Sequence, residues 1–222
     1  MKHVIKGAAP AIFDAWKAMA NEDWVPTYAG LQNPEKLALQ QSLLAEQGGV
    51  CCYCGRGISE GDSHIEHFRP QTEHENLALE YSNIFASCIR ETSPGAPLHC
   101  GHAKGDECDE ARLISPLEPG CEARFLYTLA GEISPRDPAD EQAKYMQELV
   151  KLDIAFLRNR REEVLKRTFD VEFIDSATEL ELKALRDAFL SRNAEGKLQS
   201  FAHVLARYAA QRLDDSTDGP GI

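Results

Sequence analysis

Four of the seven cysteines in this chain have the spacing of a tetrahedral metal site. Cys51 and Cys54 form a C-x-x-C pair followed by glycine, which is typical of a zinc knuckle in which two thiolates on a tight turn occupy two corners of a tetrahedron. Cys88 and Cys100 are the natural second pair, because the residues between them read as a loop that bulges out between two ligands at little cost in closure entropy. The spacing therefore predicts one structural zinc held by these four thiolates.

Two alternatives remain open for these cysteines. Buried thiols can pack as small hydrophobic side chains without a metal, and Cys108 could replace Cys100 as the fourth ligand. Residues 50–122 favour the metal, because they combine clustered Cys and His with several Gly and Pro and only short apolar runs. Such a segment has too little apolar material for a core of its own, and a metal would stabilise it. Cys52 is interpreted as a neighbour that does not ligate.

Polar residues of the types that catalyse phosphodiester cleavage lie between and just after these cysteines in the sequence. Glu66, His67 and Asn83 lie between the two pairs, and His102 and Lys104 follow the last cysteine. Hydrolysis assisted by one metal ion requires a base that activates water, a cation that stabilises the developing charge, and a group that orients the base. Glu66 and His102 are therefore predicted to hold a catalytic Mg²⁺ or Mn²⁺, with His67 as the base. Asn83 is predicted to accept from Nδ1–H of that imidazole, and Lys104 to contact a phosphate.

Glu66 and His67 are adjacent in the short apolar run 64–68, which reads as a strand. Neighbouring strand residues point to opposite sides, so this pair can offer one side chain to the metal and the other to the attacking water. His64 shares a strand face with Glu66, but a single histidine is more often an ordinary polar residue. His64 and His74 are both interpreted in that way.

The composition divides the chain into three parts. The central part is poor in core residues, whereas apolar residues at helical spacing dominate on both sides of it. The fold expected from this order is α+β, with a metal-stapled unit flanked by N-terminal helices and a helical C-terminal region. The three parts are a helical lead-in over 1–49, the zinc-stapled part over 50–122, and a hairpin followed by a helical region over 123–222.

In the first part, apolar residues at helical spacing predict helices over 10–21 and 34–47. Asn33 is expected to cap the second helix, and Pro34 suits its first turn because that position needs no backbone N–H. The glycines that follow residue 47 are expected to end it.

In the third part, alternating apolar residues predict a hairpin over 124–134. Helices are expected from residue 140 onward, and Ser176 with Glu179 has the pattern of a capping box. The chain is expected to end in a polar tail over 214–222.

The net charge of −12 opposes a simple nucleic-acid-binding function, because phosphate binding usually draws on a basic surface. Residues 151–167 are locally basic, and a partner could also supply positive charge. A charged cluster is usually a solvated face, but Arg158, Arg160 and Arg161 are the residues expected to contact nucleic acid or a partner protein.

The longest apolar runs are far shorter than the roughly 20 residues that span a bilayer, and the N-terminal residues lack the apolar segment of a secretory signal. The sequence therefore predicts a cytoplasmic protein without a membrane partner. Clustered thiols in that reducing compartment bind metal more often than they form disulfides.

These motifs together resemble those of HNH endonucleases, whose ββα-metal motif is commonly threaded through two cysteine pairs, and most of all the retron-associated and Septu anti-phage nucleases. A weaker likeness continues through the predicted hairpin to about residue 165. The motifs that carry the resemblance lie at residues 51–55, 65–71, 81–88 and 100–105.

The resemblance implies a ββα-metal unit with Glu66 in the first metal-ligand position, His67 in the general-base position and Asn83 in the orienting position. The last position departs from the common pattern. In many HNH proteins the final His directly follows the last Cys, whereas here Gly101 intervenes and His102 stands where this subgroup more often has Asn. Members of the subgroup work beside an ABC-type ATPase, so the resemblance also implies that partner.

The leading hypothesis is a metal-dependent endonuclease that cuts DNA, or RNA, as the effector of an anti-phage defence system. The second hypothesis is a non-catalytic, zinc-stabilised adaptor that docks a partner protein through its helical C-terminal region. A zinc hydrolase acting on a small molecule ranks last, because His64, Glu66 and His67 do not form a helical HExxH motif.

Overall fold

A computed structural model of this 222-residue chain describes residues 1–217, with side chains through residue 214. The described residues contain eight α-helices and two antiparallel two-stranded sheets. The fold is therefore α+β, as the sequence predicts. The helices and strands in chain order are α1 (Ala11–Lys17), α2 (Glu35–Glu46), β1 (Ser63–His67), β2 (Ile84–Cys88), α3 (Gly101–Lys104), β3 (Phe125–Tyr127), β4 (Ile133–Pro135), α4 (Glu141–Leu149), α5 (Ala155–Thr168), α6 (Val171–Ser176), α7 (Glu179–Leu190) and α8 (Ala202–Thr217).

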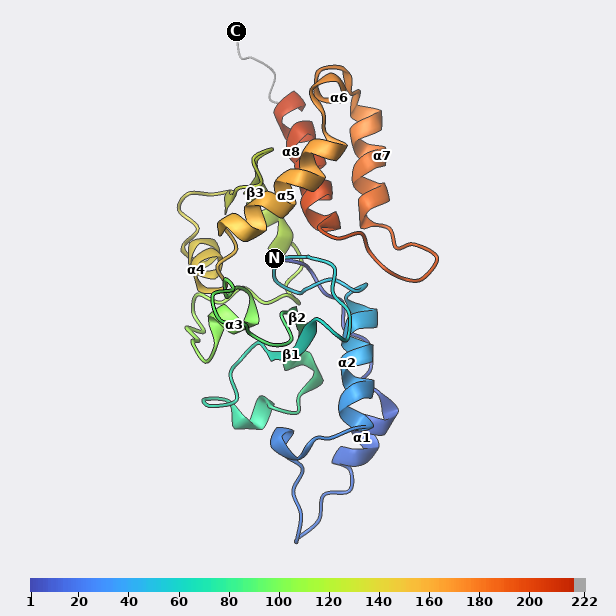
Figure 1. Cartoon of the computed structure of the whole chain (residues 1–222), viewed down its shortest axis with the longest axis vertical. Coiled ribbons are helices and arrows are strands. Elements are labelled where there is room, and N and C mark those ends of the chain that lie inside the picture. The colour runs from blue at the N-terminus through green and yellow to red at the C-terminus, as the bar shows by residue number, and fades with distance from the viewer. Residues whose placement is uncertain (218–222) are drawn as a thin grey trace.

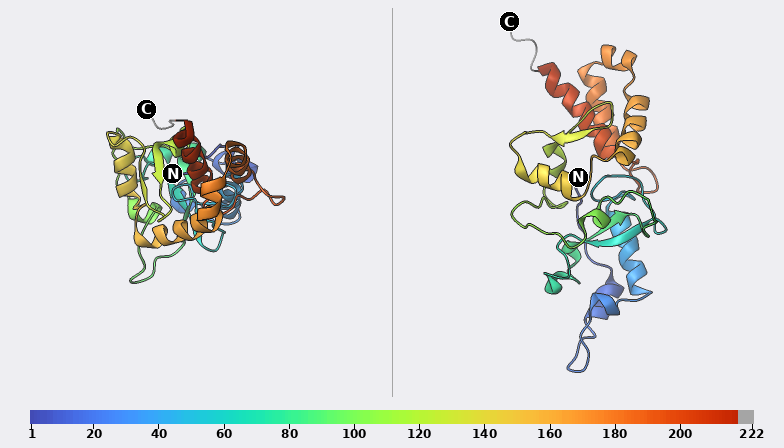
Figure 2. Two further views of the ribbon diagram at one scale, coloured as in Figure 1. Left: turned by 90° about the horizontal axis from the view of Figure 1, so that it is seen from above. Right: turned by 60° about the vertical axis from the view of Figure 1, so that its left-hand side comes forward.

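The β1–β2 hairpin lies in the middle of the molecule, with α1 and α2 toward one end and α6 to α8 at the other (Figures 1 and 2). The strands are antiparallel, and their register pairs Ser63 with Cys88 and His67 with Ile84. Cys88 therefore lies at one end of the hairpin, while the Glu66–His67 pair lies toward the other. α3 is a single helical turn that begins directly after Cys100.

Both predicted N-terminal helices form, as α1 and α2. The prediction that Asn33 caps the second helix is wrong, because α2 begins at Glu35 after Pro34 and no side chain caps its N-terminus. The two helices instead gain stability by packing. Their buried side chains form one apolar cluster with the β1–β2 region, made of Phe13, Trp16, Leu31, Leu39, Leu43, Tyr81, Ile84 and Ala86.

The predicted hairpin over 124–134 is confirmed by β3 and β4. The capping box is displaced from its predicted position. The Thr178 hydroxyl oxygen accepts from the backbone N–H of Glu181, and the backbone N–H of Thr178 donates to the Glu181 carboxylate, whereas Ser176 ends α6. Of the predicted polar tail, residues 214–217 continue α8 and residues 218–222 lie outside the described part.

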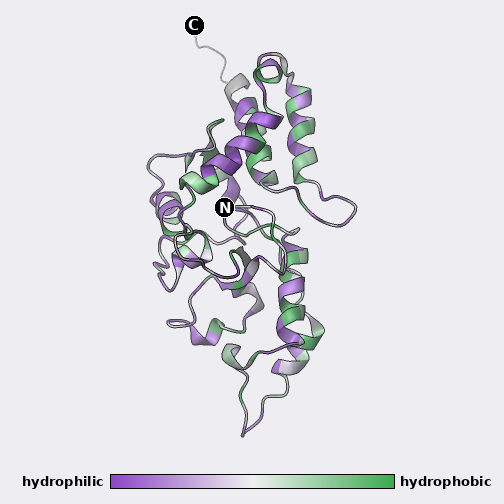
Figure 3. Ribbon diagram, in the orientation of Figure 1, coloured by the Kyte–Doolittle hydropathy of each residue, from purple (hydrophilic) through white to green (hydrophobic). Residues whose placement is uncertain are grey.

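α5 is largely hydrophilic along its length (Figure 3). It still contributes Leu157 and Leu165 to the main apolar core, which makes it a surface helix with a narrow buried stripe. Among the residues described, none of the helices combines the length and apolar character that a membrane-spanning segment requires.

The apolar core is continuous across the predicted divisions near residues 49 and 122. The backbone N–H of Lys2 donates to the carbonyl of Cys52 at 3.0 Å, and that of Phe201 donates to the carbonyl of Gly55 at 2.7 Å. Gly55 itself has φ +73, and a Cβ there would lie 2.1 Å from the ring of His203 at the start of α8. The knuckle turn is therefore packed between the N-terminal segment and α8.

Candidate metal centre and candidate active site

Four buried thiols meet at the base of the β1–β2 hairpin. Cys51 and Cys54 come from the turn after α2, Cys88 ends β2, and Cys100 precedes α3. Their ligand atoms all lie within 4.8 Å of one another. This confirms that the two predicted pairs come together, and four convergent sulfur donors are the set that a structural zinc takes up as a tetrahedron.

The surroundings of the cluster suit bound thiolates. Burial, together with the neighbouring Cys51, raises the pKa of the Cys100 thiol, so a cation is needed to stabilise four thiolates at this place. His99 points its Nδ1 atom at two of the sulfurs, 3.4 Å from Cys88 and 3.2 Å from Cys100. The backbone N–H of Cys88 also donates to Cys51 at 3.4 Å. These contacts hold the sulfurs in place from outside the cluster.

Cys108 is not part of this group. Its side chain is partly exposed, and the four clustered sulfurs include that of Cys100 instead. The alternative in which Cys108 replaces Cys100 is therefore wrong. Cys52 is buried beside the cluster but does not belong to it, as predicted.

Glu66 is the centre of a buried polar network at the end of β1. Its Oε1 accepts from the Tyr53 hydroxyl at 3.0 Å and lies 3.2 Å from Lys104 Nζ. Its Oε2 lies 3.2 Å from His64 Nε2. The carboxylate thus has one oxygen fixed by a hydroxyl and an ammonium group, and the other turned toward an imidazole.

His64 lies beside Glu66 and His102, although the sequence was interpreted as giving it no role in the site. Its ring lies 4.4 Å from that of His102, measured between centroids. His64 Nδ1 is 2.6 Å, and His102 Nε2 is 2.9 Å, from the same backbone oxygen, that of Ile89. Burial lowers the pKa of His64 and its hydrogen bond with Glu66 raises it, with a net increase. The signal in the sequence was the i, i+2 spacing of His64 and Glu66 on one strand face.

His67 points to the other side of β1. Its Nε2 lies 2.9 Å from the carbonyl oxygen of Ala78, so this nitrogen carries the hydrogen. Its Nδ1 faces the side-chain amide of Gln71 at 3.2 Å, and Tyr28 packs edge-on against the ring. Burial lowers the pKa of His67, which favours a neutral imidazole with its lone pair on Nδ1.

The prediction that Asn83 orients the His67 ring is wrong. Asn83 accepts from the backbone N–H of Arg69 at 2.8 Å and donates to the carbonyls of Arg69 and Leu77 at 3.0 and 3.2 Å. It therefore fixes the 69–77 loop that carries the partners of His67, while the Ala78 carbonyl sets the tautomer of the ring.

The prediction of a phosphate contact by Lys104 is also wrong. Its side chain is only 1% exposed and forms an ion pair with Glu66, so it acts within the protein. α3 places this ammonium group beside Glu66, because Lys104 is its last residue and its side chain extends toward β1.

The three arginines predicted to contact nucleic acid or a partner differ in their surroundings. Arg161 is buried and donates to the carbonyls of Gly131 and Leu152 at 2.7 and 2.8 Å, so the prediction is wrong for this residue. Arg158 is engaged by Asp153. Arg160 is exposed, with its guanidinium 3.6 Å from the centre of the Phe156 ring, and a contact there stays a prediction.

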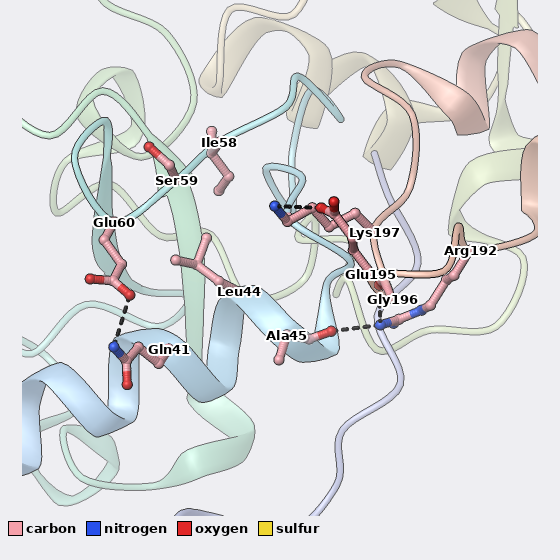
Figure 4. A pocket seen from close by; sticks show the side chains of 11 residues that line it. Gln41, Leu44, Ala45, Ile58, Ser59, Glu60, Arg192, Glu195, Gly196 and Lys197 are labelled. Carbon is pink, nitrogen blue, oxygen red and sulfur yellow. Dashed lines mark hydrogen bonds and ion pairs between the residues drawn. The ribbon is translucent and has the colours of Figure 1, made fainter.

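Two surface cavities differ in their relation to the predicted site residues. One is lined by residues 25–29 and 71–79, and it includes Tyr28, Gln71 and Ala78, the three residues in contact with the His67 ring. The other lies between α2 and the 192–197 loop, where Arg192 donates to the Ala45 carbonyl at 2.6 Å (Figure 4). The predicted site residues all belong to the described part of the chain, and none of them lines this second cavity.

The chain matches no known family model and has no significant match among curated proteins.

Proposed function

We propose that this protein is a metal-dependent endonuclease of the HNH type, in which the four-cysteine cluster holds a structural zinc and β1, β2 and α3 form the ββα-metal unit. The observation that carries the proposal is the arrangement at the end of β1. The His67 imidazole and the Glu66 carboxylate lie next to each other in the chain and face opposite sides of the same strand, and burial lowers the pKa of His67, which favours the neutral form that a base requires.

Glu66 and His102 are the proposed ligands of a divalent cation, which would stabilise the charge that develops on the cleaved phosphodiester. His67 is the proposed base, because the partner of its Nδ1, the Gln71 amide at 3.2 Å, lines a cavity, and a water that takes the place of this amide could give its proton to Nδ1. In-line attack by that water would leave a 5′-phosphate and a 3′-hydroxyl. DNA is the favoured polymer and RNA the second.

By its resemblance to the retron-associated and Septu nucleases, the protein is further proposed to be the effector of an anti-phage defence system, controlled by an ABC-type ATPase. The acidic balance of the chain, −12, supports a partner that supplies positive charge for the nucleic acid. Arg160, exposed on α5, is the proposed contact of this helix with nucleic acid or with the ATPase.

The test compares wild type with His67→Ala on plasmid DNA and on total RNA, in Mg²⁺ and in Mn²⁺, with and without the co-encoded ATPase. His74→Ala is the matched control, because His74 lies in the same part of the chain and contacts only the exposed Glu110 among the ion pairs formed. Zinc is counted in all three proteins. The proposal requires about one zinc per chain throughout and cleavage by wild type and His74→Ala only.

A non-catalytic adaptor is the second candidate, and one observation favours it. The Glu66 carboxylate is already paired with Tyr53, Lys104 and His64, which is also what a purely structural buried network requires. If no protein cuts either polymer while zinc and ATPase binding are retained, the adaptor is the correct function.

A further inference from the structure

We propose that His64 is a ligand of the divalent cation, together with Glu66 and His102, and that this site selects a first-row transition ion over Mg²⁺. The inference rests on the proposed function for the role of the ion, and the place of His64 in the ligand set comes from its contacts with Glu66 and with the His102 ring, between β1 and α3, which lie side by side in Figure 1.

The two imidazoles face the same backbone oxygen. A carbonyl oxygen can only accept hydrogen bonds, so the nitrogens that face the Ile89 oxygen, Nδ1 of His64 and Nε2 of His102, must carry hydrogen. In the neutral rings the lone pairs are then on His64 Nε2 and His102 Nδ1. Metal-bound histidines characteristically donate their other N–H to a backbone carbonyl or a carboxylate in this way.

The strained backbone at Ile89 places one carbonyl oxygen within hydrogen-bond distance of both rings. Ile89 has φ +71, a left-handed conformation that is rare and strained for a β-branched residue. Such a conformation persists only where the surroundings hold it, and here it directs one carbonyl to two histidines. Ile89 directly follows Cys88, so the zinc cluster fixes the residue next to the strained one.

The separation of His64 from Glu66 suits two ligands of one ion. Two ligand atoms about 2.1 Å from one ion and about 100° apart lie roughly 3.2 Å from each other. His64 Nε2 and Glu66 Oε2 are separated by 3.2 Å. The second oxygen of Glu66 is held by Tyr53 and Lys104, which orients the carboxylate without using the oxygen that faces His64.

The backbone of α3 comes very close to these two atoms. Gly101, the first residue of α3, lies so close that a Cβ would be 2.2 Å from Glu66 Oε2 and 2.6 Å from His64 Nε2. Only glycine lets α3 approach these two atoms so closely, and the residue after it is His102. The glycine that separates the last cysteine from the last histidine thus allows α3 to bring His102 beside His64 and Glu66.

Two imidazoles and one carboxylate are a donor set for Mn²⁺, Co²⁺, Ni²⁺ or Zn²⁺, whereas Mg²⁺ prefers oxygen ligands and water. Mn²⁺ is the suitable probe, because it is a hard ion that binds thiolates weakly and should leave zinc in the cysteine cluster. Its binding can be followed by electron paramagnetic resonance, and spin-echo spectra detect ¹⁴N of coordinated imidazole.

The experiment titrates Mn²⁺ into zinc-loaded wild type, His64→Gln, Gly101→Ala and the control His74→Gln, with Mg²⁺ as competitor. His74 is matched to His64 in exposure, 22% against 20% of the side chain. Wild type and His74→Gln should bind about one Mn²⁺ per chain with ¹⁴N coupling. His64→Gln should bind at least tenfold more weakly with reduced coupling, and Gly101→Ala should also bind at least tenfold more weakly, although it keeps every ligand.

Equal zinc content and equal melting temperatures show that the variants are folded. The inference is overturned if His64→Gln binds Mn²⁺ as tightly as wild type, if its ¹⁴N coupling is unchanged, or if Mg²⁺ competes on equal terms. In the first two cases His64 and Glu66 are only a hydrogen-bonded pair. A chain that binds Mn²⁺ through His64 but cuts no nucleic acid would support the ligand set and overturn the nuclease, so the two proposals fail separately.

Discussion

Lys104 Nζ lies 3.2 Å from Glu66 Oε1, and the two side chains are 1% and 7% exposed. This ion pair joins α3 to β1 beneath the candidate active site. The hydroxyl of Tyr53 donates to the same oxygen, which gives the buried carboxylate two partners besides His64. A buried charge without its partner is strongly destabilising, so the geometry of Glu66 depends on a residue that sequence reasoning assigned to phosphate binding.

Replacement of Lys104 tests whether the buried Glu66 carboxylate depends on this ion pair. Lys104→Met should lower the free energy of unfolding by about 3 kcal/mol, because the Glu66 carboxylate would remain buried without a cation. Urea denaturation of zinc-loaded protein measures the change. Lys197→Met, which removes an exposed ion pair with Glu195, is the control and should change stability by less than about 1 kcal/mol. Equal effects of the two substitutions would show that the buried pair does not form.

The four-thiol cluster makes a prediction about zinc content. Cys100→Ser should lose most of its zinc and unfold at lower temperature, because three thiolates hold the ion less tightly than four. Cys108→Ser should keep about one zinc per chain and the wild-type melting temperature. Metal analysis and thermal unfolding with and without a chelator give both quantities. Loss of zinc from Cys108→Ser, with full zinc content in Cys100→Ser, would instead identify Cys108 as the fourth ligand.

His203 makes stability depend on pH. Burial, with nearby positive charges, lowers the pKa of His203 well below its ordinary value, and its Nδ1 has no hydrogen-bond partner among the described residues. The unfolded chain therefore binds a proton that the folded chain excludes once the pH falls below about 6.5. Stability should fall there by up to about 1.4 kcal/mol per pH unit from this group.

Urea unfolding of wild type and His203→Gln between pH 7.5 and 5.5, at saturating zinc, checks this dependence. Other groups titrate in both proteins, so the difference between the two curves isolates His203. The curve of the variant should be flatter below about pH 6.5. Parallel curves would mean that His203 is protonated in the folded protein as readily as in the unfolded chain.

Truncation of the neighbouring arginines Arg160 and Arg161 on α5 should change the stability of the protein by very different amounts. Arg161→Ala would leave the carbonyls of Gly131 and Leu152 without a donor and open a cavity, and should cost about 3 kcal/mol. Arg160→Ala should change stability by less than about 1 kcal/mol and, if the proposed contact exists, weaken binding to nucleic acid or to the ATPase. A stable Arg161→Ala variant with weakened binding would restore that residue to the interface.

The sequence by itself determined the features whose signals are local. The C-x-x-C turn, the second cysteine pair, the N-terminal helices and the β3–β4 hairpin all depend on spacing within short segments. Such features can be predicted because hydrophobic period, turn residues and ligand spacing act over a few residues. The capping box was misplaced by two residues, since several polar residues in that stretch could serve as caps.

Only the tertiary structure decided which polar residues share a site. Residue type marks a side chain as charged or polar, but not whether a distant segment covers it or supplies its partner. His64 joins Glu66 and His102 because the backbone at Ile89 turns its carbonyl toward both rings. Lys104 and Arg161 are buried because carboxylate and carbonyl oxygens from other segments compensate their charge, at a cost that only the assembled core can offset.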